Sequence, residues 1–321
     1  MKEITRRLKQ AERVVIASHY NPEGDAIGGV LALYIALEKM GKQVHAYNRD
    51  GVPFNLSFLP YAEKISRQLP SWQPDVAVIV DCGDFHRVGK EAECVLAKVP
   101  LVINIDHHPT NPNFGHLNVV DPKKASASQL VAELIDELGI TWSKEMAENI
   151  YTGIVADTGS FQFSNTDAKV LRTSARMVEL GANPSRVANF LYYDLPEKNL
   201  HLLAKALSTL KTECGGEIAT MEVTEDMMNS TGTDADATEG FVDYARSVRG
   251  VKVAVLFRQT DENEYKISLR SKGMLDVAQI ARFYGGGGHK EAAGCTIKGA
   301  LEEVKRELIE KIRNAISTCT A

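Results

Sequence analysis

The sequence predicts an α/β protein with an N-terminal parallel-sheet domain, flanked by helices, and a smaller mixed α/β domain after it. Three observations predict this. Short β-branched runs alternate with helical periodicity in the first part, two strands adjoin one another later, and 321 residues exceed one usual domain. We expect a first domain over residues 1–185, a helical linker over 186–212 and a second domain over 213–321.

The first domain is expected to contain strands joined by crossover helices. Runs rich in β-branched residues predict the strands, and amphipathic periodicity predicts the helices. Gly41 is placed to end the first of these helices in a left-handed conformation. The expected strands are 13–18, 44–47, 75–80 and 101–105, and the expected helices are 26–40, 126–138, 143–156 and 167–180.

The second domain has a different pattern. Residues 183–211 predict helices without strands, and the pattern changes after Gly215 and Gly216. Two adjacent strands favour a hairpin and therefore a mixed sheet. The expected elements are an extended run at 217–223, strands at 252–259 and 264–269, and helices at 237–248, 277–284 and from residue 301.

Composition and charge exclude several classes of protein. The 37 Lys and Arg against 42 Asp and Glu give a net charge of -5, too acidic to coat long nucleic acid by charge alone. The N-terminal segment lacks the apolar core of a signal peptide, so we expect no export and no membrane anchor. The cysteines are odd in number and never spaced C-x-x-C, which favours reduced thiols in a cytoplasm. They are Cys82, Cys94, Cys214, Cys295 and Cys319.

Three of the expected strands end in clusters of polar residues. The clusters are SHYNPEGD at 18–25, DCGD at 81–84 and DHH at 106–108. Ligands of open parallel sheets bind beyond the carboxyl ends of the strands, so these loops can converge on one site.

The side chains of these clusters are of the types that hold divalent cations. Carboxylate and imidazole donors without thiolates favour Mn²⁺ or Mg²⁺ over structural zinc, with iron and cobalt also open. Four of the carboxylates, those of Glu23, Asp25, Asp81 and Asp157, carry four negative charges together, which two divalent cations would neutralise. The candidate residues are His19, Glu23, Asp25, Asp81, Asp106, His107, His108 and, near the end of a helix, Asp157.

Taken one at a time, some of these residues also have a structural explanation that involves no metal. Asp25 suits the N-cap of a helix, Asp81 suits a strand-end turn, and an isolated His19 suits a structural role. Their gathering at the ends of consecutive strands favours a metal site over these separate explanations. Strand alternation is expected to turn Cys82 into the core. The remaining histidines are expected to be structural or at the surface, namely His45, His86, His116 and His201.

With these motifs the chain resembles the DHH family of phosphoesterases that carry a DHHA1 domain. The resemblance covers nearly the whole length and includes the later segment GGGGHKEAAG at 285–294. That family contains nanoRNases, pAp phosphatases and dinucleotide phosphodiesterases. It implies that His19 and Glu23 hold one Mn²⁺ and that Asp81 bridges it to a second ion. The second ion would be held by Asp25, His107 and Asp157.

The resemblance also implies roles outside the metal ligands. His108 would contact phosphate and assist the leaving group, and Asp106 would orient the neighbouring imidazoles. Glu23 stands where the family usually has Asp, so the first metal is expected to shift, to change in preference or to be bound by both oxygens.

A glycine-rich segment and local positive charge point to an anionic ligand. Four glycines before His289 let the backbone approach a ligand and offer amide donors, and they match no Walker loop. Residues 246–290 contain nine Lys or Arg against four acids. Arg270 and Ser271 end a strand, where they can grip a terminal phosphate. The resemblance implies that nucleotides are bound by Arg270, Ser271, Gly286, Gly287, Gly288 and His289.

The implied function is a hydrolase acting on ester bonds. It would cleave short oligoribonucleotides (nanoRNA) to mononucleotides, or 3′-phosphoadenosine 5′-phosphate (pAp) to AMP, by a hydroxide shared between two Mn²⁺ ions, with Mg²⁺ or Co²⁺ as alternatives. A phosphodiesterase for pApA or cyclic di-AMP is the alternative, and a non-catalytic nucleotide-binding protein is a weaker one. Inorganic pyrophosphatase is disfavoured, because its basic C-terminal clamp is absent. Expected partners are short RNA or nucleotides, without long nucleic acid or membrane; a homodimer is left open.

Overall fold

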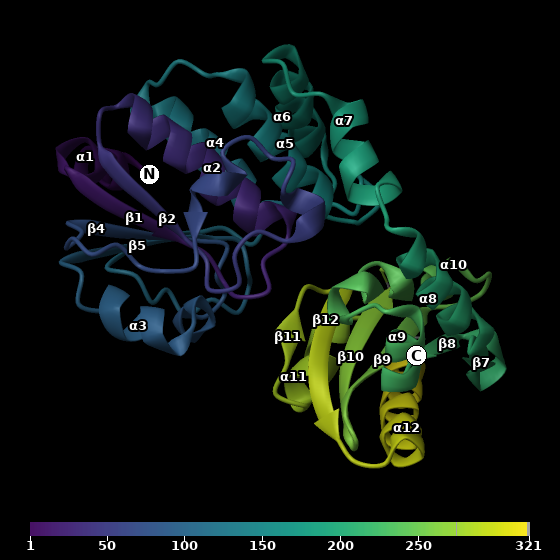
Figure 1. The fold of residues 1–321 in the computed structure, drawn as a ribbon. Helices are drawn as coiled ribbons and strands as arrows, with labels where there is room; N and C mark the ends of the chain where they lie inside the picture. The colour runs from purple at the N-terminus through teal and green to yellow at the C-terminus, as the bar shows by residue number, and fades with distance from the viewer. Residues whose placement is uncertain (274, 320–321) are drawn as a thin grey trace. The chain divides into compact units, whose positions relative to one another are not determined.

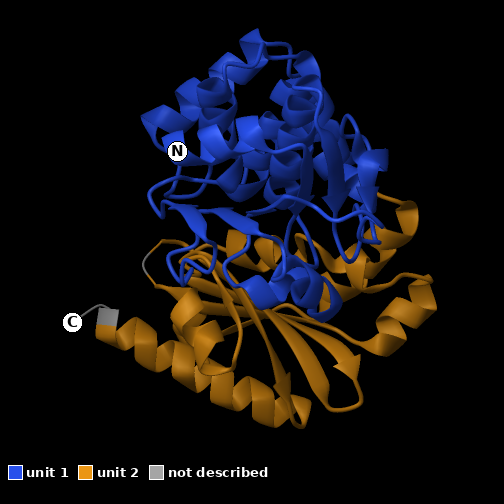
Figure 2. Cartoon of the chain, turned by 90° about the vertical axis from the view of Figure 1, so that its left-hand side faces the viewer, with its two compact units in different colours: residues 1–194 blue, residues 195–321 orange. Residues whose placement is uncertain are grey.

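The computed structural model describes residues 1–273 and 275–319, apart from the side chain of residue 319. The chain divides into two compact units, Met1–Asp194 and Leu195–Ala321, which are coloured separately in Figure 2. The division falls inside the segment expected to be a helical linker. None of the helices among the described residues is long and apolar enough to cross a membrane.

The first unit is built on a six-stranded sheet with the order β3-β2-β1-β4-β5-β6, in which all neighbours are parallel (Figure 1). Its strands are β1 (Arg13–Ala17), β2 (Gln43–Tyr47), β3 (Ile65–Ser66), β4 (Val76–Val80), β5 (Leu101–Asp106) and β6 (Leu117–Val120). Its α-helices are α1 (Lys2–Gln10), α2 (Gly24–Lys39), α3 (Lys90–Leu96), α4 (Ala127–Leu138), α5 (Lys144–Asp157), α6 (Ala168–Glu179) and α7 (Pro184–Ala188). A π-helical turn, Asn189–Tyr193, follows α7.

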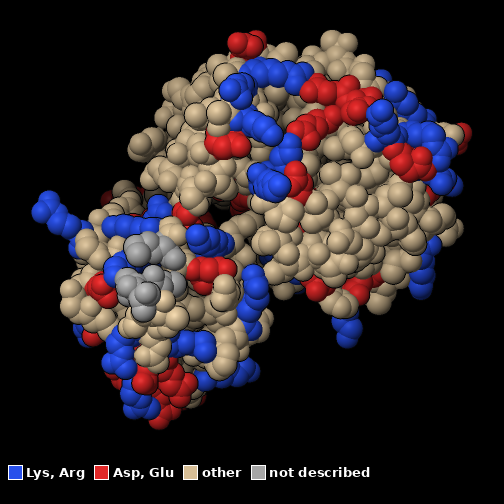
Figure 3. Space-filling view, turned by 180° about the vertical axis from the view of Figure 1, so that it is seen from behind, with Lys and Arg blue, Asp and Glu red and all other residues tan. Residues whose placement is uncertain are grey.

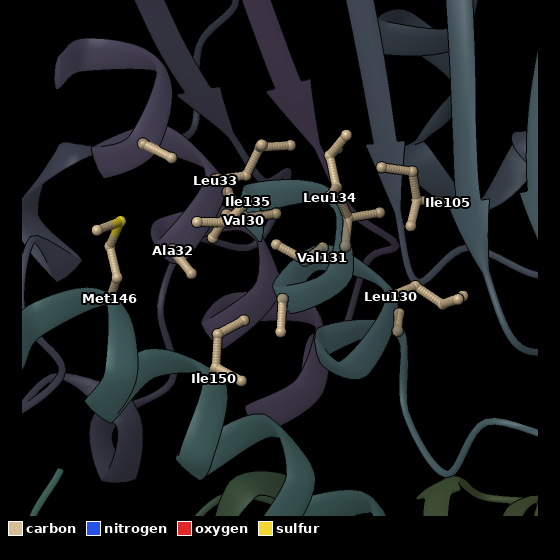
Figure 4. Packing of buried hydrophobic residues seen from close by; sticks show 14 of the residues in the cluster. Val30, Ala32, Leu33, Ile105, Leu130, Val131, Leu134, Ile135, Met146 and Ile150 are labelled. Carbon is tan, nitrogen blue, oxygen red and sulfur yellow. The ribbon is translucent and has the colours of Figure 1, made fainter. Parts of the chain in front are cut away.

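Both faces of this sheet are covered, as parallel sheets require. The run VAVIV of β4 is buried along its whole length, because its alternate side chains enter two different cores. Val78 and Val80 pack with helices α2, α4 and α5, and Ala77 and Ile79 pack with α3 on the other face. Figure 4 shows part of the first core, where Val30 of α2 lies among Leu130, Val131 and Leu134 of α4.

The strand order creates one place where ligands can bind. β1 lies between β2 and β4, so the chain reverses its direction of travel across the sheet at this point. Ligands of open parallel sheets bind beyond the carboxyl ends of the strands at such a reversal. β1 ends at Ala17, β4 at Val80 and β5 at Asp106, so the three polar clusters emerge at the same edge.

Glycines let helices α2 and α5 approach closely. A Cβ added at Gly28 would lie 2.3 Å from the carbonyl oxygen of Asn149, and one at Gly24 would lie 2.7 Å from the Cβ of Ala156. Only residues without a side chain fit this contact. The contact brings Asp25 in the first turn of α2 beside Asp157, the last residue of α5.

The second unit carries a six-stranded mixed sheet with the order β11-β12-β10-β9-β8-β7. β8 and β9 are parallel, and the other neighbours are antiparallel. The strands are β7 (Lys211–Glu213), β8 (Ile218–Val223), β9 (Val253–Asp261), β10 (Glu264–Ser271), β11 (Gly287–Gly288) and β12 (Ala292–Lys298). The helices are α8 (Glu197–Ser208), α9 (Glu225–Thr231), α10 (Phe241–Ser247), α11 (Val277–Phe283) and α12 (Leu301–Cys319).

The predicted fold class is confirmed, and the expected strands and most of the expected helices form within a few residues of their predicted bounds. The helix expected at 237–248 forms only from Phe241, after a 3-10 turn at Ala235–Thr238. The elements that the sequence analysis missed are α1, α3, α9 and the strands β3, β6, β7, β11 and β12. Most of these are short, so they contain too few residues for a periodic pattern.

The contact between α2 and α5 predicts a large effect of one added methyl group. Gly28→Ala should lower the free energy of unfolding by about 2 kcal/mol, because overpacking against a backbone carbonyl outweighs the gain of about 1 kcal/mol in helix propensity. Calorimetry measures the effect. Gly287→Ala is the control, since its Cβ would meet nothing within 4 Å. Equal unfolding temperatures for the two variants would contradict the packing argument.

Candidate active site

The first unit gathers six of the predicted metal ligands into two groups at the carboxyl edge of its sheet. The donor atoms within each group lie within 4.8 Å of one another. Because the ligands come from the ends of different strands and helices, the tertiary fold alone brings them together. The first group is His19, Glu23 and Asp81, and the second is Asp25, His107 and Asp157.

Asp81 lies between the two groups and points one oxygen at each. Its Oδ2 is 3.4 Å from Nε2 of His19, and its Oδ1 is 3.6 Å from Nε2 of His107. The Asp81 backbone has a φ of 54°, in the left-handed region that residues with a side chain rarely adopt. This conformation turns the carboxylate out of the strand direction, while the Asp81 amide still donates to the carbonyl of Ile105 over 2.9 Å.

Backbone carbonyls orient the two imidazoles. Nδ1 of His19 is 2.7 Å from the carbonyl oxygen of Tyr20, and Nδ1 of His107 is 3.2 Å from that of Lys124. A proton on each Nδ1 satisfies these contacts and leaves Nε2 as the coordinating nitrogen, which is how metal-binding histidines are usually held. Both Nε2 atoms face the carboxylates.

The carboxylate of Asp25 is fixed by the start of helix α4. The amides of Ala127 and Ser128 donate to it over 2.6 and 2.8 Å. The side chain of Asp25 is fully buried. Burial raises the pKa of Asp25 well above 3.8, and the charges of Asp81 and Asp157 raise it further. Asp25 therefore does not cap its own helix.

The acids and imidazoles shift one another's pKa values strongly. Burial alone would lower the pKa of His19, but the charges of Glu23 and Asp81 raise it well above 6.5. The pKa of His107 is raised well above 6.5 in the same way by Asp157 and Asp81, against the effect of burial. Burial opposes ionisation of Asp81, but the facing imidazoles of His107 and His19 hold its pKa well below 3.8. These shifts favour a negative Asp81 between positive imidazoles of His19 and His107, whereas burial opposes a negative charge on Asp25.

The residues present fit a pair of divalent cations. The buried Oδ1 of Asp81 has no hydrogen-bond partner among the described residues. Such an atom is costly unless a ligand satisfies it. All the donors are carboxylate oxygens or imidazole nitrogens, a set that suits Mn²⁺ and Mg²⁺. The longer side chain of Glu23 reaches the group, with Oε1 3.2 Å from Nε2 of His19, although 48% of the side chain is exposed.

His108, the third residue of the DHH motif, is oriented by a carboxylate and not by a backbone carbonyl. Its Nδ1 lies 2.8 Å from Oδ1 of Asp106, and Asn111 donates to Oδ2 of the same aspartate over 2.6 Å. Burial lowers the pKa of His108, but Asp106 and Asp81 raise it above 6.5 overall. Asp106 therefore orients His108 alone, whereas a backbone carbonyl orients His107.

The predicted nucleotide-binding residues of the second unit differ in how buried they are and in the bonds that they make within the protein. The Ser271 hydroxyl is fully buried and donates to the carbonyl of Leu275 over 2.8 Å, so it ties a loop together rather than facing solvent. The Arg270 side chain is 19% exposed, near Asp243 at 4.0 Å. The His289 amide donates to the carbonyl of Ala292 over 2.7 Å, which closes a tight turn before β12.

The glycine run contains the short edge strand β11 and packs closely against β12. A Cβ at Gly286 would lie 2.1 Å from the carbonyl oxygen of Gly294, and one at Gly288 would lie 2.5 Å from that of Ala292. These two glycines are needed for packing against β12. Only Gly287 of the three predicted contacts has open space beside its Cα, so it alone is open to a ligand from that side.

Other polar residues lie outside the two donor groups. Cys82 is buried in the core beside α3, as expected. His45 and His116 bond to backbone groups, and His86 and His201 lie beside nearby glutamates at the surface. The sequence analysis missed Asn111 and also Asn48, whose buried amide donates to the carbonyl of His19 over 2.8 Å. An asparagine closely following a catalytic cluster is a weak signal that could have indicated the first of these.

The raised histidine pKa values predict that metal binding releases protons. The shifts favour the protonated imidazoles of His19 and His107, which should lose protons when they coordinate a cation, so affinity should rise with pH. Titration calorimetry with Mn²⁺ at pH 7 in buffers of different ionisation enthalpy measures the release. His19→Ala should reduce the number of protons by about one. Heats that are the same in every buffer would contradict the assignment.

Comparisons with known proteins identify the family to which the chain belongs. A family model described as "DHH family, N-terminal domain" matches residues 13–154, and one described as "DHHA1 domain" matches residues 215–318. The bifunctional oligoribonuclease and PAP phosphatase NrnA of Thermus thermophilus is 38% identical over 95% of this chain and 90% of its own. The protein of the same name from Bacillus subtilis is 26% identical over 92% of each chain.

A solved structure also shares the fold over the full length. It is an exopolyphosphatase-related protein from Bacteroides fragilis, with a TM-score of 0.87 and 29% identity, and the match covers 98% of this chain and 95% of that one. Together with the two family models and the Thermus relative, this likeness extends across both units. The chain therefore belongs to the DHH family and carries a C-terminal DHHA1 domain.

Proposed function

We propose that this protein is a phosphoesterase that hydrolyses short oligoribonucleotides to mononucleotides and pAp to AMP. The observation that carries the proposal is Asp81, a buried carboxylate shared between two groups of metal-type donors. The name of the Thermus thermophilus relative, oligoribonuclease and PAP phosphatase, supports these two substrates. Figure 3 shows acidic and basic side chains interspersed over one face of the molecule, which suits a small substrate better than long nucleic acid.

The proposed cofactors are two Mn²⁺ ions, with Mg²⁺ or Co²⁺ as alternatives. His19 and Glu23 would hold one ion, Asp25, His107 and Asp157 the other, and Asp81 both. When bound, such a pair supplies a nucleophilic water at neutral pH and neutralises charge on the phosphoryl oxygens. The Asp25 carboxylate is held in place by the two amides of α4, so little reorganisation is needed to bind a cation.

His108 is proposed to protonate the leaving group. As the oxygen of water bonds to phosphorus, the ester P–O bond breaks and the departing oxygen needs a proton. Asp106 binds Nδ1 of His108 over 2.8 Å, which fixes the ring and stabilises its protonated form. Nε2 is then the nitrogen that delivers the proton. The water loses its protons to solvent, and His108 recovers one for the next cycle.

In the second unit, Arg270, His289 and Gly287 are the proposed contacts to the nucleotide. Arg270 supplies a charge that suits a terminal phosphate, and Gly287 is exposed with no atom within 4 Å of a Cβ position. Ser271, Gly286 and Gly288 are proposed to act indirectly, by shaping the loops that carry these groups.

A substrate panel tests the proposed function. With Mn²⁺ present, the protein should convert pAp to AMP and cleave pApA and RNAs of two to five nucleotides, with slower turnover of longer RNA and of cyclic di-AMP. Asp81→Asn should lower kcat at least about 10³-fold, because it removes the shared charge. Asp84→Asn, on the same loop, should leave kcat within twofold, since its side chain only accepts from the His86 amide. Failure to cleave any member of the panel overturns the proposal.

The pH profile tests the role of His108. Asp106 raises the pKa of His108, so kcat should fall as pH rises through that pKa and the acid form is lost. In Asp106→Asn the neighbouring negative charge is gone, so the alkaline limb should move to lower pH. Unshifted profiles in this variant would show that His108 is not the acid.

A further inference from the structure

The two faces of the second sheet are covered unequally. One face packs under α11 and α12 from β8 to β12, with Tyr265, Ile267 and Leu269 of β10 in that core. On the other face, the core formed with α8 and α10 contains residues of β8 and β9 but none of β10 or β12. The outward side chains of β10 and β12 therefore form an open face, which consists of Glu264, Lys266, Ser268, Arg270, Gly294, Thr296 and Lys298.

Two cations stand opposite each other where the covered and open parts of this face meet. Lys266 of β10 pairs directly with Arg258 of β9 in the antiparallel register. Arg258 continues the alternation of Ala254 and Leu256, so it lies on the same face as Lys266. Side chains opposed in this way have Cβ atoms about 5 Å apart, and like charges at that spacing destabilise the sheet.

Arg258 has the features of an anion-binding residue. It is half-buried, yet its guanidinium makes no hydrogen bond or ion pair of its own among the described residues. Burial lowers its pKa, and Asp236 and Glu239 oppose this only through longer-range attraction. An anionic ligand at this position can supply paired acceptors to the guanidinium.

The pair is aligned with the proposed contact to the terminal phosphate. Lys266, Ser268 and Arg270 alternate along the open side of β10. Four residues of a strand span about 14 Å, so Lys266 and Arg270 are separated by more than one nucleotide. Ser268 pairs with Gly294 across β10 and β12, and because both residues are small, no bulky side chain of this pair stands between Lys266 and Arg270.

We propose that Arg258 and Lys266 bind backbone phosphates of an oligoribonucleotide beyond its terminal nucleotide. This inference rests on the proposed function for its class of substrate. Phosphate is the partner that the charges favour, because its oxygens accept hydrogen bonds from both a guanidinium and an ammonium group. The pair then contributes to the binding of RNAs of several nucleotides and not to that of pAp, which has too few phosphates to reach it.

Binding measurements on the full chain test this inference. Fluorescence anisotropy with labelled pentaadenylate is measured in the Asp81→Asn background, and pAp is measured by competition. Arg258→Ala with Lys266→Ala should weaken pentaadenylate binding about tenfold and reduce the salt slope by about 1.4. The affinity for pAp should stay within twofold. Arg258→Lys, which keeps the charge, should restore part of the loss.

The control removes two cations from the α12 side of the same unit. Arg306→Ala with Arg313→Ala should change neither affinity, since both residues are exposed on the helix that covers the other face of the sheet. An unchanged pentaadenylate affinity, or an equal loss for pAp, overturns the inference. If the unaltered protein binds RNA in this way but cleaves no substrate, the proposed function fails while the phosphate contacts stand.

Discussion

The mutual repulsion of buried carboxylates is the constraint on which the rest of this structure depends. Two carboxylates about 4 Å apart repel by about 4 kcal/mol at an effective dielectric constant near 20. Donor oxygens of Asp25 and Asp157 lie within 4.8 Å of each other, the charge of Asp81 also acts on Asp25, and the pKa values of His19, His107 and His108 are raised in response. Protons or bound cations relieve this repulsion, and the carboxylate and imidazole donors gathered here suit divalent cations, so the charge of the cluster points to the chemistry of the site.

The fold brings the residues of this cluster together and fixes their positions. The reversal of strand order at β1 and β4 brings three loops to one edge, and the glycines of α2 and α5 bring two more aspartates beside them. The left-handed backbone at Asp81 aims one carboxylate at both groups. Backbone carbonyls and helix amides fix three of the six donors, namely His19, His107 and Asp25. Their positions are therefore set by the main chain, which tolerates little distortion around the site.

Sequence reasoning succeeded where a local pattern of residue types determines the structure. The β-branched runs and the polar clusters after them predicted the sheet and the edge where the candidate ligands gather, while the division of these ligands into two groups came from the resemblance to the DHH family. It failed where the deciding contact is made in space: Asn111 reaches Asp106, α4 binds Asp25, and Ser271 turns into its own loop. The glycine run was expected to approach a ligand, yet two of its residues are required by β12. The opposition of Arg258 and Lys266 likewise depends on strand register, which residue counts do not contain.

The most direct measurement is anomalous diffraction at the manganese edge from crystals of this protein grown with Mn²⁺. Two peaks about 3.5 to 4 Å apart, one on either side of the Asp81 carboxylate, are the result that this account predicts. A single peak distant from Asp81, or none at this edge of the sheet in well-ordered crystals, would contradict it.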